Sequence, residues 1–345
     1  MQLEMPKFIG EKDYQHGSGD RTGILITNLG TPDEPNSRAL KRYLKEFLSD
    51  PRVIELPKFI WQIILRIIIL QIRPAKSAKT YQSIWTKNGS PLLLISTKQL
   101  NLIKKKSDNM FPNTIFGLAM RYGNPSIDSV LREFQKKQVR RLLVFPLYPQ
   151  YCAVTTASTF DEVTSILQKW RWIPELRFIN QYFEEKKYIQ ALSNSISNFW
   201  KKHGKPQKII FSYHGIPKKY HIKGDPYHCF CLKTTRLVKE YMKLNDEEVT
   251  TTFQSRFGRE EWLQPYTKET LENLPKEGVK NVNIISPGFS ADCLETLEEL
   301  EVENREYFEK AGGKNYHYIP CLNDDSMHIE MMIDIIKKHT NGWKI

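Results

Sequence analysis

The chain has 345 residues, of which 40% are hydrophobic and 26% charged, a composition typical of globular proteins that excludes a disordered or fibrous chain. This length exceeds what one hydrophobic core usually serves, so we expect two domains. Lysine and arginine outnumber aspartate and glutamate by 51 to 39, a formal net charge of +12 that favours an anionic partner. Because the sequence contains no nucleic-acid-binding motif, we expect no nucleic-acid partner.

The N-terminal segment and the cysteines indicate where the protein works. Residues 1–20 mix charges with glycine and lack an apolar core, so we expect a flexible tail and no signal peptide. The cysteines are too few and too scattered for a disulfide framework, namely Cys152, Cys229, Cys231, Cys293 and Cys321. A reducing compartment is therefore expected, and the protein is predicted to be cytoplasmic.

The first predicted unit, residues 21–170, alternates short apolar runs with amphipathic stretches, which is the pattern of an α/β fold. Strands are predicted over residues 23–30, 114–120 and 141–147, with helices over 37–48 and 126–138. Residues 59–70 form the most apolar stretch. It is shorter than the roughly 20 residues of a spanning helix, so it is either a buried core helix or an exposed apolar lip that meets a membrane or an apolar ligand.

The second predicted unit, residues 171–320, repeats the alternation without close sequence repetition. Its strands are predicted over residues 175–179, 208–213, 249–254 and 281–286, and its helices over 188–202, 231–244 and 267–274. Residues 321–345 are expected to form a closing helix over 326–338. The predicted fold class is α/β, with two similar Rossmann-like, doubly wound domains whose sheets are parallel.

Familiar catalytic fingerprints are missing from both units. No G-x-G-x-x-G follows a predicted strand, and no G-x-x-x-x-G-K-[ST] occurs, which argues against nucleotide-dependent hydride transfer and ATP hydrolysis. H-E-x-x-H and G-x-S-x-G are also absent, which argues against a zinc protease and a serine hydrolase.

His214 directly follows the strand predicted over residues 208–213. Ligands of open α/β sheets collect at the carboxyl ends of the strands, so His214 is a candidate site residue. A neutral imidazole binds transition metals, and its pKa near neutrality also suits proton transfer. The alternative is a histidine that only caps a loop by hydrogen bonding.

Four carboxylates follow the strand predicted over residues 281–286, on an expected helix. Steps of three and four residues place Asp292, Glu295, Glu299 and Glu303 on one face, roughly 6 Å apart along the axis. Like charges this close repel one another unless a divalent cation or transferable protons offset them. The alternative is a solvated acidic face beside an apolar core stripe.

Further candidates follow other strands. Arg121, Tyr122, Tyr148 and Tyr151 lie just past two predicted strands, where a cation and phenols suit a flat, carboxylated aromatic ligand. They are alternatively loop anchors. Cys229 and Cys231 are a weak metal pair, because structural zinc sites prefer two to four intervening residues; a helix start is expected there.

Several motifs, in order along the chain, resemble those of the ferrochelatase family from residue 23 to the last residues. They are GILITNLGTP (23–32), FLSDPRV (47–53), YQSIW (81–85), GSPLL (89–93), YPQY (148–151), TTAS (155–158), SYHGIP (212–217), TFQSRFG (252–258) and LETLEEL (294–300). The resemblance implies two Rossmann-like domains with a porphyrin cleft between them. It also implies insertion of Fe²⁺ into protoporphyrin IX, which forms protohaem in the last step of haem biosynthesis.

The resemblance also implies residue roles. His214 and Glu295 correspond to the family's catalytic, metal-contacting pair, while Glu299 and Glu303 correspond to its metal or proton path. Arg121 and Tyr122 match positions that face the porphyrin or a metal route, and Tyr148 is expected to contact the porphyrin. Cys293 stands where some members carry a second histidine, which weakens the case for a metal relay through that position.

The sequence also leads to expectations about cofactors, partners and alternative functions. Some members hold a [2Fe–2S] cluster on C-terminal cysteines, but here only Cys321 lies late, so no iron–sulfur cluster is expected and Fe²⁺ is a substrate. We expect a monomer, with a possible peripheral contact to the inner membrane surface. The alternatives are a chelatase of the same fold for coproporphyrin or cobalt, a non-catalytic tetrapyrrole carrier, and a basic nucleic-acid-binding protein.

Overall fold

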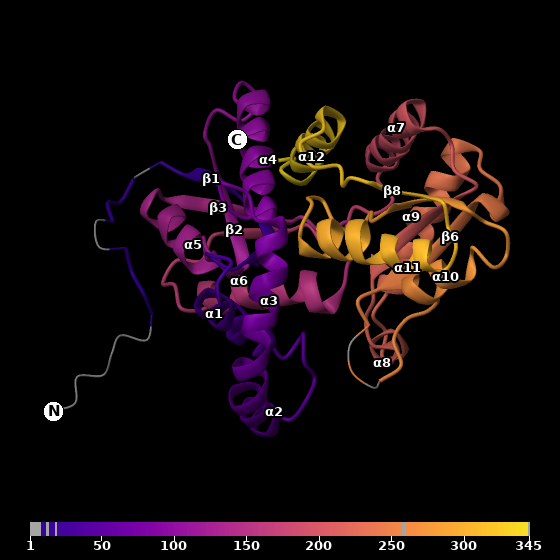
Figure 1. The fold of residues 1–345 in the computed structure, drawn as a ribbon. Helices are drawn as coiled ribbons and strands as arrows, with labels where there is room; N and C mark the ends of the chain where they lie inside the picture. Colours follow the sequence, from indigo (N-terminus) through magenta and orange to yellow (C-terminus); the bar gives the residue numbers. More distant parts are fainter. Residues whose placement is uncertain (1–7, 12–13, 18, 257, 259, 344–345) are drawn as a thin grey trace.

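The computed structural model describes residues 8–11, 14–17, 19–256, 258 and 260–343, and contains two four-stranded parallel sheets (Figure 1). The first sheet has the order β2-β1-β3-β4, with β1 Arg21–Thr31, β2 Thr114–Gly123, β3 Val139–Pro146 and β4 Glu175–Phe178. The second has the order β6-β5-β7-β8, with β5 Lys208–His214, β6 Val249–Gln254, β7 Asn281–Ile285 and β8 Asn315–Ile319. The predicted α/β class with two parallel-sheet units is confirmed.

Helices flank both sheets. Those of the first half are α1 Ser37–Leu48, α2 Lys58–Ile64, the π-helical η1 Leu65–Ile69, α3 Leu70–Ile84, α4 Pro91–Ser107, α5 Ile127–Lys136, the π-helical η2 Ala153–Ala157 and α6 Ser158–Leu167. Those of the second half are α7 Lys186–His203, α8 Lys218–Ile222, α9 Tyr227–Met242, the 3₁₀ turn η3 Asp246–Glu248, α10 Thr267–Asn273, the π-helical η4 Glu295–Glu303, α11 Asn304–Lys310 and α12 Ser326–His339.

The central strands carry continuous apolar runs because helices cover both faces of each sheet. Ile24, Leu25 and Ile26 of β1 are fully buried, and so are Ile210 and Phe211 of β5. Burial of each such side chain contributes about 1.5–3 kcal/mol to folding. These two strands are therefore the rigid supports from which the functional loops emerge.

Two features of the second predicted unit are corrected. The strand Glu175–Phe178 pairs with β3 of the first sheet, Arg141 opposite Glu175, so the first unit extends beyond residue 170. A strand that follows helix α6 adds to the edge of the first sheet beside β3. Strand β8 was not predicted; it pairs with β7 and completes the second sheet.

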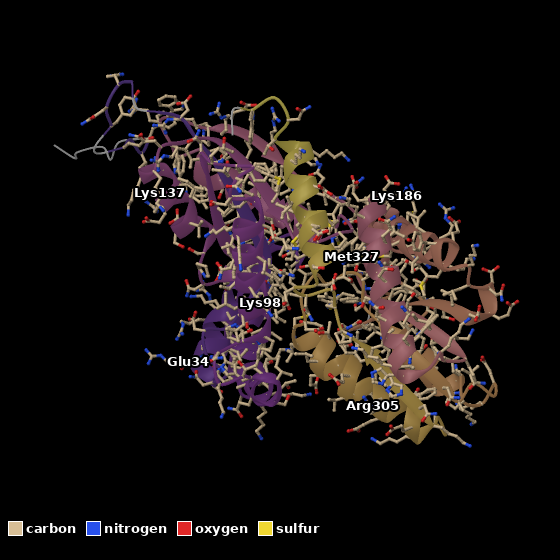
Figure 2. The ribbon with its side chains drawn as sticks, turned by 90° about the horizontal axis from the view of Figure 1, so that it is seen from above. Glu34, Lys98, Lys137, Lys186, Arg305 and Met327 are labelled. Atoms are coloured by element: carbon tan, nitrogen blue, oxygen red, sulfur yellow. The ribbon has the colours of Figure 1, made fainter. Side chains whose placement is uncertain are left out.

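The closing helix α12 lies where the sequence predicts it and packs between the two units. It contacts α4 of the first unit and α7 of the second. Seen from above, α12 (Met327) lies between α4 (Lys98) and α7 (Lys186) (Figure 2). Lys106 Nζ bonds to Glu330 Oε1 at 2.9 Å across the α4–α12 contact.

The described part of the N-terminal tail is held against the first unit. Ile9 forms a parallel bridge with Trp170. The carboxylate of Glu11 accepts two hydrogen bonds from the guanidinium of Arg140, at 2.7 and 2.9 Å. Ile9 and Glu11 thus contact the first unit, while residues 1–7, 12–13 and 18 lie outside the described part; the flexible tail over residues 1–20 stays a prediction.

Candidate active site

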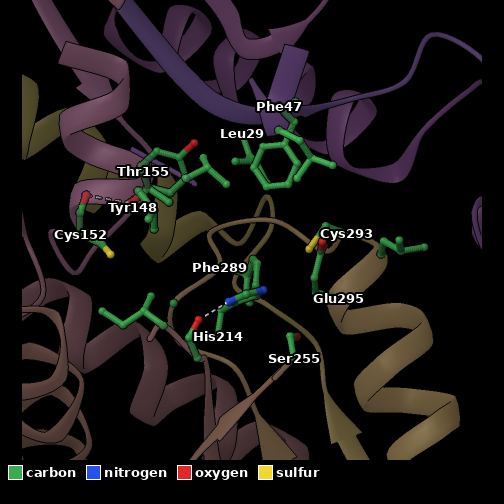
Figure 3. A pocket seen from close by; sticks show the side chains of 18 of the residues that line it. Leu29, Phe47, Tyr148, Cys152, Thr155, His214, Ser255, Phe289, Cys293 and Glu295 are labelled. Carbon is green, nitrogen blue, oxygen red and sulfur yellow. Dashed lines mark hydrogen bonds between the residues drawn. The ribbon is translucent and has the colours of Figure 1, made fainter. Parts of the chain in front are cut away.

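A cavity of about 540 Å³ lies between the two units, within the usual size range of small-molecule sites. Its lining comes from the carboxyl end of β1, helices α1 and α3, and the loops after β3, β5 and β7. Figure 3 shows His214 and Glu295 on the second-unit side, with Leu29 and Phe47 of the first unit facing them. Both units of one chain therefore build the cavity.

His214, the last residue of β5, lines the cavity. Its Nδ1 lies 2.7 Å from the carbonyl oxygen of Gly215. A carbonyl only accepts hydrogen bonds, so Nδ1 carries the proton and Nε2 keeps a lone pair. Gly215 permits the close packing behind this ring: an added Cβ would lie 2.9 Å from the Gln254 carbonyl oxygen and 3.1 Å from the Trp262 ring. The backbone thus fixes the orientation of the imidazole.

Glu295 and Glu299 lie on η4, beside the end of β6. The amide Nε2 of Gln254 donates to the Glu295 carbonyl at 3.1 Å and approaches Glu299 Oε2 at 3.3 Å, while Ser255 Oγ donates to Glu299 Oε2 at 2.5 Å. A side chain that bonds to a helix carbonyl disturbs the regular backbone ladder, and this accounts for π-helical geometry where an α-helix was predicted. Such π-segments are frequent at functional sites.

The environment of Glu299 changes its acidity. Burial raises the pKa of its carboxyl group, and the negative charge of Glu295 adds to that rise. The hydrogen bond from Ser255 and the electrostatic influence of nearby His214 act in the opposite direction without cancelling it. Glu299 is therefore a weaker acid than an ordinary glutamate and lies within electrostatic reach of both cavity residues.

The four-carboxylate stripe is not continuous. Asp292 is buried and turned toward Tyr318 and Asn323, whose OH and Nδ2 each donate to it at 2.6 Å, so it does not face the cavity. Glu295 lines the cavity, Glu299 is half-buried, and Glu303 is exposed and accepts a hydrogen bond from Tyr307. Three of the four predicted carboxylates thus lead from the cavity to the surface.

Arg121 and Tyr122 do not line the cavity, contrary to the expectation that they contact the porphyrin. Both belong to β2, which continues three residues past its predicted end, so their side chains lie along the faces of the sheet. Tyr122 is fully buried, and its OH donates to Asp50 Oδ2 at 2.8 Å. Arg121 and Ser158 donate to the same oxygen at 2.6 and 2.5 Å. We call Asp50, Arg121, Tyr122 and Ser158 the Asp50 cluster.

Tyr148, which is predicted to contact the porphyrin, lines the cavity from the loop after β3, whereas Tyr151 does not line it. Burial raises the pKa of Tyr148, so its phenol stays protonated. Sequence reasoning missed Gln254 and Ser255, although both lie in the TFQSRFG motif. It also missed two cations of the cavity wall, Arg73 and Lys219, for which residue type and spacing gave no signal.

The apolar stretch 59–70 forms α2 and η1, which project from the first unit (Figure 1). Phe59 and Ile67 are 78% and 67% exposed. Leu65 is buried against Leu48 and Leu70. A fully buried helix is therefore excluded, and we call the exposed set the lip: Phe59, Ile60, Ile63, Ile67, Ile68 and Ile72. Within the described residues, no helix combines the length and apolarity needed to cross a bilayer.

Comparisons with known proteins agree with this architecture. A family model described as Ferrochelatase matches residues 21–340. The chain is 53% identical to a ferrochelatase of Marinobacter nauticus, over 97% of this chain and 91% of the relative. It is 56% identical to one of Hydrogenovibrio crunogenus, over 96% and 89% of the two chains.

Solved structures share the fold at low sequence identity. SirB from Bacillus subtilis with Fe³⁺ superposes with a TM-score of 0.55 at 12% identity, covering 93% of this chain and 96% of SirB. CbiX, described as the terminal enzyme for biosynthesis of siroheme in denitrifying bacteria, superposes with a TM-score of 0.50 at 12% identity, covering 92% and 98%.

Proposed function

The chain belongs to the ferrochelatase family, and from this premise we propose that it inserts Fe²⁺ into protoporphyrin IX to form protohaem. The observation that carries the proposal is the cavity itself: apolar walls from both units enclose a space that His214 and Glu295 both line. Such a space suits a large apolar ring whose reactive nitrogens must face polar side chains.

The reaction exchanges two pyrrole N–H protons for one Fe²⁺ ion and releases two protons. A planar ring shields its nitrogen lone pairs. An enzyme therefore accelerates metal insertion by binding the ring in a bent form, and contacts to other parts of the ring offset the strain. His214 offers an Nε2 lone pair and Glu295 a carboxylate to the cavity. We assign both to the ring centre, where each serves as proton acceptor or iron ligand as protons leave and iron enters.

A path for protons or iron continues from this centre through Glu299 and Glu303. Burial weakens the acidity of Glu299, and a group that both accepts and releases protons works best when its pKa lies closer to neutrality. Ser255 and Gln254 hold its carboxylate in place. Glu303 is exposed and ends the path in solvent.

The cavity wall also provides contacts for the rest of the porphyrin. Leu29, Phe47 and Tyr148 offer apolar and aromatic surface to the ring faces. Arg73 and Lys219 take the place that Arg121 was predicted to fill, as cations for the two propionates. Because one chain supplies all of this lining, we propose that the monomer is active.

The lip suggests how an apolar substrate enters. Trp61, Ile69 and Arg73 of the same helical projection line the cavity, so the lip is continuous with the cavity mouth. Exposed apolar side chains next to lysines and arginines suit the boundary between lipid headgroups and acyl chains. We propose that the protein is cytoplasmic and collects the porphyrin at the inner membrane surface.

We further propose that activity requires no iron–sulfur cluster. Among the described cysteines, Cys152, Cys231, Cys293 and Cys321 are buried, and burial raises the pKa of each thiol. Cluster ligation requires four thiolates. Protein purified without oxygen that holds stoichiometric acid-labile sulfide would contradict this proposal.

The function is tested with purified protein, Fe²⁺ and protoporphyrin IX, without oxygen and without ATP. Stoichiometric formation of protohaem is expected. Parallel reactions with coproporphyrin and with Co²⁺ identify a chelatase of different specificity. Tight porphyrin binding without metal insertion in any of these reactions would instead identify a carrier.

A further inference from the structure

Three metal-binding side chains converge at the corner between α8 and α9, outside the residues that line the cavity. The ligand atoms of His221, His228 and Cys229 all lie within 4.8 Å of one another. The sequence suggested only a weak pair of Cys229 and Cys231, but Cys231 is buried in the core whereas Cys229 is exposed. The metal-binding candidates in the structure are therefore two histidines and one cysteine. His221 lies on α8, and His228 and Cys229 lie on α9.

The corner is held in place by Asp225. Its Oδ1 accepts the backbone N–H of Tyr227 at 3.0 Å, and its Oδ2 accepts the backbone N–H of Ala153 at 2.8 Å. The loop between α8 and α9 is therefore fastened to the first unit. His221 Nδ1 lies 3.4 Å from the Asp225 carbonyl oxygen, so Nε2 is the ring nitrogen left to bind an ion. A histidine ligand whose other ring nitrogen meets a carbonyl is the usual arrangement at metal sites.

The second imidazole is also positioned by packing. The rings of His228 and His221 meet edge to face at 5.0 Å, and His228 lies 5.4 Å from the Phe253 ring. These contacts hold the two imidazoles next to each other at the corner.

Positive charge near the corner is offset. Lys218 bonds to Glu261 at 2.9 Å, Lys219 to Glu260 at 2.7 Å, and Lys223 to Glu55 at 2.8 Å. These three lysines of α8 and the loop after it thus each have a carboxylate partner. A divalent cation at the corner therefore does not face uncompensated ammonium groups.

We propose that His221, His228 and Cys229 form a binding site for a divalent transition-metal ion, separate from the centre where iron enters the porphyrin. Two imidazoles and one thiolate suit borderline ions such as Zn²⁺ and Fe²⁺, and Zn²⁺ is expected to bind more tightly. Ligand atoms around a tetrahedral ion at 2.0–2.3 Å lie about 3.5 Å apart, so small side-chain rotations close the site. The Cys229 thiol loses its proton to solvent when the sulfur–metal bond forms.

The ion would fasten a wall of the cavity. Lys219, Tyr220 and Tyr227 line the cavity and lie next to His221 or His228 in the chain. A metal that joins α8 to the first turn of α9 would restrain these three side chains. The site therefore goes beyond the proposed chelation and stabilises the second-unit side of the cavity mouth.

The test uses the full chain in a His214→Ala, Glu295→Gln background, so that metal at the cavity centre does not contribute. Titration with Zn²⁺ alone, against a competing chelator, is expected to give one tight ion per chain. Adding His228→Ala or Cys229→Ser should weaken it by at least about 100-fold, beyond the 10–100-fold typical of outer-sphere changes. The control is His203→Ala, an exposed histidine of α7 that should leave the affinity unchanged.

Two further readouts make the result decisive. Co²⁺ in the site should show thiolate-to-metal charge-transfer absorption that Cys229→Ser abolishes, and Fe²⁺ added without oxygen should be displaced by Zn²⁺. Metal-free variants should keep the parent's melting temperature, which shows that they fold. Zn²⁺ affinity that is the same with and without His228 and Cys229, or no tight ion in the parent, would overturn the site whether or not the protein inserts iron.

Discussion

The two sides of the cavity are built in opposite ways. The second-unit side consists of strand-end loops whose polar groups are tied to one another: His214 to Gly215, and Glu299 to Ser255 and Gln254. The first-unit side extends into the lip, where Phe59 and Ile67 are mostly exposed. Under the proposed function, this difference corresponds to a division of labour, in which a rigid polar wall performs the chemistry and an exposed apolar projection collects the substrate.

The Asp50 cluster joins the lip to the rigid sheet, so removing it should have the largest effect. Asp50→Ala leaves Arg121 buried without its closest carboxylate partner, which costs about 3–5 kcal/mol. Chemical denaturation is expected to show this loss, and exposed Asp161→Ala, which removes the surface pair with Arg52, should cost about 1 kcal/mol or less. Equal losses would show that the cluster does not anchor the first-unit wall.

The polar wall is tested next by Glu295→Gln. This change keeps the shape of the side chain and removes its charge, so turnover should fall by at least about 100-fold, the scale of a lost general base. Steady-state kinetics at saturating porphyrin measures the loss. Glu298→Gln on the same helix is the matched control, because Glu298 does not line the cavity. Comparable turnover in the two variants would remove Glu295 from the reaction.

Glu299 predicts a pH dependence. Burial raises its pKa in the folded protein, so the folded state binds this proton more tightly than the unfolded state does. The contribution of Glu299 is thus fully present in acid, below the ordinary pKa of glutamate, and is lost as the pH rises through the raised value. As the pH rises through this range, the melting temperature of the parent should fall relative to that of Glu299→Gln, because glutamine does not ionise. Parallel curves would contradict a raised pKa.

The lip should show the smallest effect on stability. Ile63→Ser together with Ile67→Ser should change the free energy of unfolding by less than about 1 kcal/mol, because both side chains are exposed. Vesicle binding should fall and the apparent KM for protoporphyrin should rise. Leu65→Ser in the same segment should instead destabilise by several kcal/mol, since Leu65 is fully buried. Unfolding caused by the double change would refute the lip.

The two walls also differ in how far the sequence predicts them. His214 was found because a buried strand ends beside it, and Glu295 because regular carboxylate spacing pointed to η4. Arg121 and Tyr122 were misplaced because β2 runs three residues further than its apolar run, which turns both side chains toward the faces of the sheet. Gln254 and Ser255 were missed, since a contact between β6 and η4 depends on tertiary packing that no local pattern encodes.

The most direct test of the account is metal insertion into porphyrin already bound to the protein. Parent protein and His214→Ala are loaded with protoporphyrin IX, mixed with Fe²⁺ without oxygen, and followed by the loss of porphyrin fluorescence in a single turnover. We expect equal porphyrin affinity and equal melting temperature, with insertion slower by at least about 100-fold in the variant. Insertion at the parent rate in His214→Ala would contradict the assignment of chemistry to the second-unit wall.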